Sequence, residues 1–248
     1  MSEIQSLARG LKILDLLAQS QEGVSITELA EVLHVDKASA SRLVATLAQY
    51  GYAEKDLTSR RFHLGLQVVT LGQSLLERLS LGEVAKPFLR QLMERTGECS
   101  HLAVAMQEKA LYIDQVESPA TLRVNVQVGQ TAPMHCTALG KVLLAFGDQD
   151  LPRTLERHTP GTITDLIQLR AHLDLVRRQG YAVDDEEYEA GVRCLAVPVY
   201  DHQRKLAGAI GISGPSTRVT IERLPDLARA AAEIGRALTV RLQFSRPE

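Results

Sequence analysis

The sequence has no tryptophan, and aromatic residues make up only 4% of its 248 residues. Proteins that bind single-stranded nucleic acid stack bases on aromatic side chains, so this composition argues against such a role. The three cysteines, Cys99, Cys136 and Cys194, are too few and too scattered for a disulfide framework or a CxxC zinc site. Their scarcity favours a reducing compartment.

Long apolar runs are missing as well. No stretch approaches the roughly 18 apolar residues that mark a membrane-spanning helix, and the polar first ten residues do not have the pattern of a secretory signal. The formal net charge of −2 names no partner by itself. We therefore expect a soluble, cytoplasmic protein without membrane contact, long enough for one large or two small domains.

Several catalytic motifs are also absent. Gly140-Lys141 lacks the earlier glycine and the following Ser or Thr of a P-loop. Residues 211–215 lack the second glycine of a nucleophile elbow, and the chain has neither an HExxH nor a GxGxxG motif. The sequence therefore predicts a protein that is not an enzyme, with no catalytic residues, no cofactor and no metal ligands.

Three short amphipathic helices and a hairpin are predicted in the first 65 residues. Ser25 can cap the second helix together with Glu28 in a capping box, and Asp36 can cap the third. The expected core stripes are Leu7, Leu11, Leu14 and Ala18 in the first helix, Ile26, Leu29, Ala30 and Leu33 in the second, and Ala40, Leu43, Val44 and Leu47 in the third.

Two short strands, residues 53–55 and 61–65, complete the order of elements that is typical of a winged helix-turn-helix DNA-binding unit. Residues 37–61 carry a net charge of +3, whereas residues 1–62 carry −1, so positive charge lies on the third helix and the hairpin. The alternative is a small helical subdomain with a solvated polar face. The predicted DNA-contacting residues are Lys37, Ser39, Ser41 and Arg42 on the helix and Arg60 and Arg61 on the hairpin.

Residues 64–97 show one long helical pattern, which Gly82 and Pro87 interrupt. We interpret it as a linker helix followed by the first helix of a second domain. The predicted domains are residues 1–66 for DNA binding, residues 67–82 as the linker and residues 83–248 for the second domain.

From Glu98 the apolar residues alternate at strand spacing. Strands, then helices, then two more strands and a last helix predict an α+β domain in which helices cover a sheet. The last helix has its apolar stripe at Leu227, Ala231, Ile234 and Leu238. The expected strands are residues 100–107, 110–117, 122–128, 193–201 and 205–214, and the other expected helices are residues 137–146, 151–157 and 165–180.

Three segments of this domain can surround one small polar molecule. Residues 134–141 lead from a loop into a helix, whose N–H groups and dipole favour an anion by about 0.3–1 kcal/mol, or up to about 2 kcal/mol when partly buried. Residues 184–194 end at a strand, and Ser213 closes the next one. Alternatively, the histidine and cysteine of the loop have no binding role, and Cys194 is a buried apolar filler.

Six segments of the chain, taken in order, resemble the IclR family of bacterial transcription regulators over nearly the whole length. The resemblance implies an α+β fold with an N-terminal winged helix-turn-helix, a linker helix and a C-terminal GAF-like effector-binding domain. It also implies dimers or dimers of dimers that bind near-palindromic double-stranded operator DNA and sense small metabolites, many of them organic acids or aromatics. The segments are SLARGLKILDLLA, ITELAEVLHVDKASASRLVATLAQYGY, FHLG, PMHCTALGKVLLA, RRQGYAVDDEEYEAGVRCLAVPVYD and GISGP.

The resemblance also implies where the effector binds. Gly211 lies where relatives carry serine, so one donor is missing, which disfavours the glyoxylate-like ligand of some members. In the DNA-binding unit, Ala38-Ser39 lies where relatives often have Ser-Thr. His34 lies where a turn glycine is common, and histidine tolerates the left-handed conformation better than most residues. The implied effector contacts are the backbone of Ala138 and Leu139, and the side chains of Asp184, Cys194 and Ser213.

The main prediction is a ligand-responsive transcription regulator in which the effector resets two DNA-binding units through the linker around residues 67–79. Two other classes stay open. A small hydrolase would use Cys194 or Cys136 as nucleophile and His135 as base, and a metal sensor would use the same three residues as zinc ligands. A purely architectural DNA-binding protein would not need the C-terminal domain.

Overall fold

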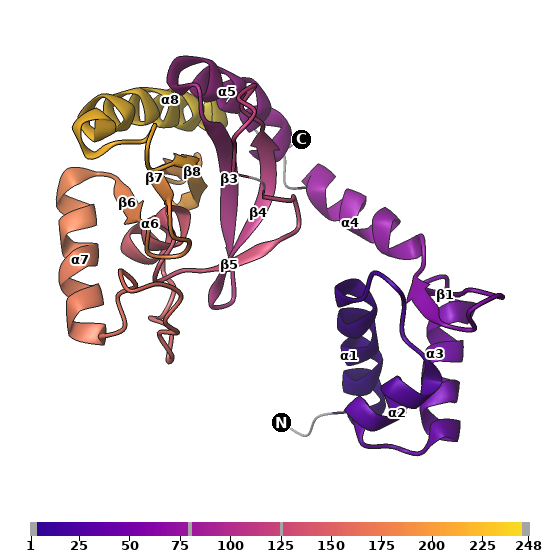
Figure 1. Cartoon of the computed structure of the whole chain (residues 1–248). Helices are drawn as coiled ribbons and strands as arrows, with labels where there is room; N and C mark the ends of the chain where they lie inside the picture. Colours follow the sequence, from indigo (N-terminus) through magenta and orange to yellow (C-terminus); the bar gives the residue numbers. More distant parts are fainter. Residues whose placement is uncertain (1–3, 79–80, 125, 245–248) are drawn as a thin grey trace. The chain divides into compact units, whose positions relative to one another are not determined.

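The chain forms two compact units, Met1–Arg78 and Leu79–Glu248. The structure is a computed structural model, drawn in Figure 1, that describes residues 4–78, 81–124 and 126–244. No helix among these residues is both long enough and apolar enough to cross a membrane.

The N-terminal unit has three helices, a hairpin and a fourth helix, in the order that the sequence predicts. They are α1 (Gln5–Gln19), α2 (Ile26–Leu33), α3 (Lys37–Gln49), β1 (Ala53–Lys55), β2 (Phe62–Leu64) and α4 (Gln67–Arg78). The capping box of Ser25 and Glu28 starts α2, and Asp36 caps α3. His34 adopts the left-handed conformation (φ 51°) in the turn between them, so these local predictions are confirmed.

The core of this unit contains the stripes expected on α2 and α3. The stripe expected on α1 is wrong, because Leu7 and Leu11 are 60% and 55% exposed. Ile13 and Leu17 are buried in their place. Helix α1 carries two apolar stripes, and only its packing against the other helices decides which one becomes core.

The C-terminal unit is built on a six-stranded antiparallel sheet with the strand order β5-β4-β3-β8-β7-β6. Its strands are β3 (Cys99–Met106), β4 (Lys109–Val116), β5 (Thr131–Pro133), β6 (Ala182–Asp185), β7 (Val192–Tyr200) and β8 (Leu206–Pro215). Its helices are α5 (Leu81–Thr96), α6 (Ala138–Phe146), α7 (Leu166–Gln179) and α8 (Leu224–Phe244), with a 3-10 turn at Ile221–Arg223. The α+β prediction is confirmed.

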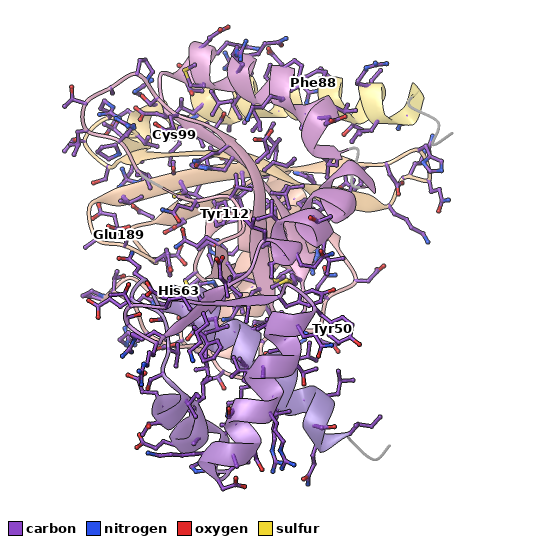
Figure 2. All side chains as sticks on the ribbon, turned by 90° about the vertical axis from the view of Figure 1, so that its right-hand side faces the viewer. Tyr50, His63, Phe88, Cys99, Tyr112 and Glu189 are labelled. Carbon is purple, nitrogen blue, oxygen red and sulfur yellow. The ribbon has the colours of Figure 1, made fainter. Side chains whose placement is uncertain are left out.

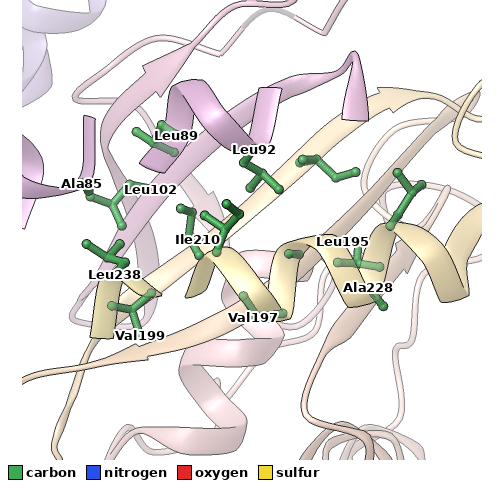
Figure 3. Packing of buried hydrophobic residues seen from close by; sticks show 14 of the residues in the cluster. Ala85, Leu89, Leu92, Leu102, Leu195, Val197, Val199, Ile210, Ala228 and Leu238 are labelled. Carbon is green, nitrogen blue, oxygen red and sulfur yellow. The ribbon is translucent and has the colours of Figure 1, made fainter. Parts of the chain in front are cut away.

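Two apolar cores cover the two faces of this sheet. Helices α5 and α8 pack on one face, where Leu92, Leu238 and Ile210 of the sheet belong to the same apolar core (Figure 3). The apolar stripe expected on the last helix is buried in this core, as predicted. Helices α6 and α7 form the second core on the opposite face (Figure 1).

Two expected elements of this unit are wrong. The described part of residues 122–128 contains no strand, because Val124 and Val126 line a cavity instead of joining the sheet; residue 125 lies outside the described residues. Residues 151–157 form no helix, although the leucines of this segment pack on the second core. The sequence pattern also gives no sign of β5 and β6, whose three and four residues are too few to show a period.

Candidate nucleic-acid interface and ligand cavity

The first two turns of α3 carry the polar side chains predicted to contact DNA. Lys37 and Arg42 are exposed, whereas Ser39 and Ser41 are half-buried. The start of the helix is held by Asp36, whose Oδ1 accepts a hydrogen bond from the backbone N–H of Ser39 at 2.8 Å. The structure thus places the four predicted residues of α3 together, while their contact with DNA remains a prediction.

Ser39 is already engaged within this helix start. Its hydroxyl donates to Asp36 Oδ2 at 2.7 Å and accepts from Arg42 Nη2 at 3.3 Å. The Ser39 hydroxyl and backbone N–H lower the pKa of Asp36. The Arg42 side chain is therefore oriented in the unbound chain, and its other N–H groups remain for a phosphate or a guanine edge.

The two arginines of the hairpin lie in different surroundings. Arg60 is exposed and adopts the left-handed conformation (φ 59°). Arg61 Nη2 lies 2.8 Å from both carboxylate oxygens of Glu28, and its Nε donates to Gly23 O at 3.0 Å. The backbone N–H of Ser25 and the Arg61 guanidinium lower the pKa of Glu28 to about 2. Arg61 thus fastens the hairpin to α2, and a phosphate has to compete with Glu28 for it.

Arg9 of α1 is a cationic neighbour of α3 that sequence reasoning misses. It borders a groove whose wall also contains Ser39, Arg42 and Thr46. Its place beside them depends on how α1 packs against α3, which no local spacing reveals.

The C-terminal unit encloses a cavity of about 170 Å³. All five residues predicted to contact an effector lie in its wall, although they come from separate segments of the chain. Tyr112 and Glu189 belong to the same wall and are labelled in Figure 2. The structure brings the predicted set together, and its binding role remains a prediction. The apolar part of the wall includes Val124, Val126, Val192 and Ile212.

The start of α6 places backbone N–H groups at the cavity. Thr137 caps this helix, because its Oγ1 accepts a hydrogen bond from the N–H of Gly140 at 3.2 Å. Ala138 and Leu139 are the first two residues of the helix and have no intrahelical carbonyl to donate to, so their N–H groups suit an anion. A Cβ at Gly140 would lie 2.3 Å from Met134 Cα, so only glycine lets the loop pass this close to the helix.

Asp184 is the buried acid of the cavity wall, with 2% of its surface exposed. Its Oδ1 accepts a hydrogen bond from the N–H of Glu187 at 2.8 Å, and the Cys194 thiol, its neighbour across the sheet, hydrogen-bonds to it. Burial raises the pKa of Asp184 to about 7, against the opposing effect of the Lys141 charge. Burial also raises the pKa of Cys194, so at neutral pH the wall presents a protonated thiol beside a carboxyl group that keeps its proton to a higher pH than an exposed aspartate does.

A buried ion pair lies near Asp184, and no local pattern in the sequence predicts it. Lys141 of α6 is fully buried, and its Nζ lies 2.5 Å from Glu187 Oε1. The second oxygen of Glu187 has no hydrogen-bond partner among the described residues. Locally, Lys141 stands out only as part of the Gly140-Lys141 pair, which lacks the rest of a P-loop. Its pairing with Glu187 has no local signal, because Glu187 lies 46 residues further along the chain.

Ser213 is held by a histidine that no motif in the sequence marks. His101 Nε2 lies 2.6 Å from Ser213 Oγ, and the His101 ring packs edge-on against Tyr112 with 5.7 Å between centroids. Burial lowers the pKa of His101 to about 4, so the ring is neutral. Opposite it in the sheet lies Gly211, where a Cβ would be 2.4 Å from the carbonyl oxygen of Leu195. A serine, like any residue with a Cβ, does not fit this backbone at position 211.

The structure does not bring together Cys194, His135 and Cys136, the three residues of the metal-sensor hypothesis and of a hydrolase that uses Cys194 as its nucleophile. His135 and Cys136 do not line the cavity. Ligand atoms of these two residues and of His158 lie within 4.8 Å of one another, and Cys194 is outside this group. Burial raises the pKa of the Cys136 thiol to about 12, which makes it a poor nucleophile.

Comparison with known sequences identifies both units. The family described as "Bacterial transcriptional regulator IclR C-terminal" matches residues 73–240, and the family described as "IclR helix-turn-helix domain" matches residues 6–57. The chain is similar to the HTH-type transcriptional regulator BhcR of Paracoccus denitrificans, at 37% identity over 95% of this chain and 86% of the relative.

Solved structures share the fold along the whole chain. The IclR protein of Thermotoga maritima matches with a TM-score of 0.74 at 28% identity, over 98% of this chain and 100% of its own. An IclR homologue of Microbacterium hydrocarbonoxydans, crystallised with 4-hydroxybenzoate, matches with a TM-score of 0.81 at 22% identity, over 97% of this chain and 100% of its own. With both units matched, the chain belongs to the IclR family of DNA-binding transcription regulators, which have an effector-binding domain and are not enzymes.

Proposed function

We propose that this regulator senses a small organic or aromatic acid in the cavity of its C-terminal unit and changes its affinity for operator DNA in response. The observation that carries the proposal is the convergence of five predicted contact residues, from separate segments, on one cavity. Its wall combines helix N–H donors with apolar side chains, which is the chemistry that an amphipathic acid needs.

The size of the cavity favours a ligand with one ring or a short carbon chain. A cavity of about 150 Å³ holds a benzene molecule, and this one measures about 170 Å³. The N–H groups of Ala138 and Leu139 would bind the carboxylate. Ser213 and Asp184 lie elsewhere in the same wall and would bind a hydroxyl or carbonyl group of the ligand. The 4-hydroxybenzoate bound by the Microbacterium homologue has this combination of groups, which makes it the first probe to try.

In the DNA-binding unit, α3 would enter the major groove of the operator, with Ser39, Ser41 and Arg42 at bases or nearby phosphates. Lys37 and the exposed Arg60 would bind phosphates. Arg61 would bind a phosphate only after its ion pair with Glu28 breaks. The free energy lost with this pair would offset part of the free energy gained from the phosphate contact.

A second copy of the chain is the partner that we propose for the exposed apolar surface of α1 and α3. Leu7 and Leu11 line an open groove there together with Leu14, Leu43 and Leu47. An exposed apolar surface of this kind is often covered in an assembly. A two-fold dimer, alone or within a dimer of dimers, would present two α3 helices to a near-palindromic operator.

Helix α4 would transmit the effect of the ligand, because it follows the hairpin and leads to the C-terminal unit. A ligand changes the DNA affinity only to the extent that it binds one of two states of the dimer more tightly than the other. An acid that saturates the chain and leaves operator affinity unchanged, measured by fluorescence anisotropy, would refute this coupling.

Thermal unfolding of the full chain tests the ligand site. The probes are 4-hydroxybenzoate, benzoate and a set of short aliphatic acids, and a bound ligand raises the melting temperature by mass action. We expect at least one acid to raise it in the native chain and not in Asp184→Ala or Ser213→Ala. Asp174→Ala, on the exposed surface of α7, is the control that keeps the response. No shift with any acid overturns the proposal.

A further inference from the structure

We propose that His135, Cys136 and His158 form a binding site for a transition-metal ion with a preference for nitrogen and sulfur ligands, of which Zn²⁺ is the first candidate. One ligand atom from each of the three residues lies within 4.8 Å of the other two. The site is separate from the cavity described above, since none of the three residues lines it.

The spacing of the three residues is close to that of a zinc site. Tetrahedral bonds to nitrogen and sulfur place neighbouring ligand atoms about 3.3–3.8 Å apart. The ligand atoms of the present group are at most 4.8 Å apart, so binding an ion would bring any two of them closer by no more than about 1.5 Å. His135 and Cys136 are consecutive residues before α6, and His158 comes from the segment between α6 and α7.

The first histidine is held by a hydrogen bond that leaves one ring nitrogen free for a metal. His135 is buried, and its Nε2 lies 2.9 Å from the carbonyl oxygen of Glu156. A carbonyl oxygen only accepts, so Nε2 carries the hydrogen and Nδ1 carries the lone pair that can bind a metal. A hydrogen bond from one ring nitrogen to a backbone carbonyl is the usual support of a histidine ligand.

The other two ligands provide a soft donor and a path for the ion. Cys136 is fully buried, so its sulfur is shielded from solvent oxidants, whereas His158 is exposed and can rotate to admit an ion. The His158 ring packs edge-on against Tyr188, with 5.0 Å between centroids. Three protein ligands leave the fourth tetrahedral position for water or another small molecule.

The position of the site gives a bound ion an effect on the neighbouring cavity. Cys136 directly precedes Thr137, the cap of α6, and Tyr188 belongs to the cavity wall. A metal ion would therefore tie the segment that enters α6 to the segment that carries His158. This link does not depend on the identity of the effector, and metal binding can be measured without any effector present.

Titration of the full chain with Co²⁺ tests the site, because a thiolate bound to Co²⁺ absorbs in the near ultraviolet and histidine ligands alone do not. We expect one equivalent of Co²⁺ to produce this band and Zn²⁺ to displace it. Cys136→Ser should abolish the band. His158→Ala, at an exposed position where folding is not at risk, should weaken Zn²⁺ binding at least about tenfold.

Two matched variants keep the test specific. His202→Ala removes an exposed histidine from the turn between β7 and β8, and Cys194→Ala removes the cysteine of the cavity; both should retain the band and the native Zn²⁺ affinity. The proposal is overturned if no thiolate band forms, if Cys194→Ala abolishes it, or if His158→Ala binds Zn²⁺ as tightly as the native chain.

Discussion

Burial dominates the chemistry of single residues around the cavity. Asp184, His101 and Cys194 have lost most of their contact with water, and the pKa of each shifts in the direction that favours its neutral form. Lys141 remains in an ion pair because Glu187 lies 2.5 Å from its Nζ. A wall of largely neutral groups suits a ligand that brings its own negative charge to the N–H groups of α6.

Asp184 should make the stability of the chain depend on pH. Its folded-state pKa is about 7 and its ordinary value is 3.8, so between these pH values the folded chain holds a proton that the unfolded chain has released. The contribution of Asp184 to the free energy of unfolding therefore decreases as pH rises through this window. Relative to the native chain, Asp184→Asn should gain stability from about pH 4 to about pH 7, by at most about 4 kcal/mol.

Urea denaturation of the native chain and of Asp184→Asn at about pH 5 and about pH 8 measures this difference. Asp174→Asn on the exposed surface of α7 is the control. A stability difference between Asp184→Asn and the native chain that is the same at both pH values would contradict the assigned pKa.

Lys141→Met should destabilise the chain by about 3–5 kcal/mol, because it leaves the Glu187 carboxylate buried without a partner charge. Lys141→Met combined with Glu187→Gln should recover much of this loss, since no unpaired charge remains. The exposed pair of Arg177 and Asp174 is the comparison, and Arg177→Met should cost no more than about 1 kcal/mol. Urea denaturation of the native chain, the two Lys141 variants and Arg177→Met measures these differences in the free energy of unfolding. A double variant as unstable as Lys141→Met would count against the ion pair.

At the scale of elements, caps set the starts of α2 and α3, and the same caps hold side chains that are predicted to contact DNA. Glu28 closes the capping box of α2 and also binds Arg61 of the hairpin. Asp36 caps α3 and also binds the Ser39 hydroxyl, which in turn accepts from Arg42. The helix ends and the hairpin are therefore ordered together before DNA binds.

Arg42→Ala should weaken operator binding about 5- to 150-fold if Arg42 contacts a base, which corresponds to about 1–3 kcal/mol. The probe is a duplex selected from a random-sequence library with the native chain, and fluorescence anisotropy gives the affinity. Arg170→Ala, an exposed arginine of α7, should leave the affinity unchanged. Native affinity in Arg42→Ala would show that α3 does not contact DNA through this residue.

At the scale of the whole molecule, the two units have separate hydrophobic cores and serve separate functions of a regulator. One core supports α3 and the hairpin, and the cores on the two faces of the large sheet support the cavity. The chain is slightly acidic as a whole, yet α3 and the hairpin, the elements that we propose to face DNA, are basic, so the proposed DNA binding depends on local charge.

The salt dependence of operator binding reports how many phosphates the assembled protein contacts. Lys37, Arg42, Arg60 and Arg61 in each of two copies can meet about eight phosphates, which predicts a slope of log affinity against log salt of about −7. Anisotropy titrations of the selected duplex at increasing salt give this slope. A slope near −2 would mean that most of these cations stay away from the backbone.

Much of the fold could be predicted because its signals are local. Ser25 with Glu28, Asp36 and Thr137 each act on N–H groups within three residues, so the helix starts they cap follow from the sequence. The cavity was predictable only in outline. The resemblance to a family indicated its five contact residues, whereas His101 and Tyr112 of the same wall carry no motif of their own.

By itself, the sequence determined the order of the helices and most strands, the polar face of α3 and the family, because periodicity, capping and motif order reside within short segments. Only the tertiary structure decided which stripe of α1 is buried and that Val124 and Val126 border a cavity instead of extending the sheet. It alone brought Glu187 to Lys141 and His158 to Cys136. These contacts join residues that are far apart in the chain, and the packing of whole elements, which no local spacing encodes, sets them.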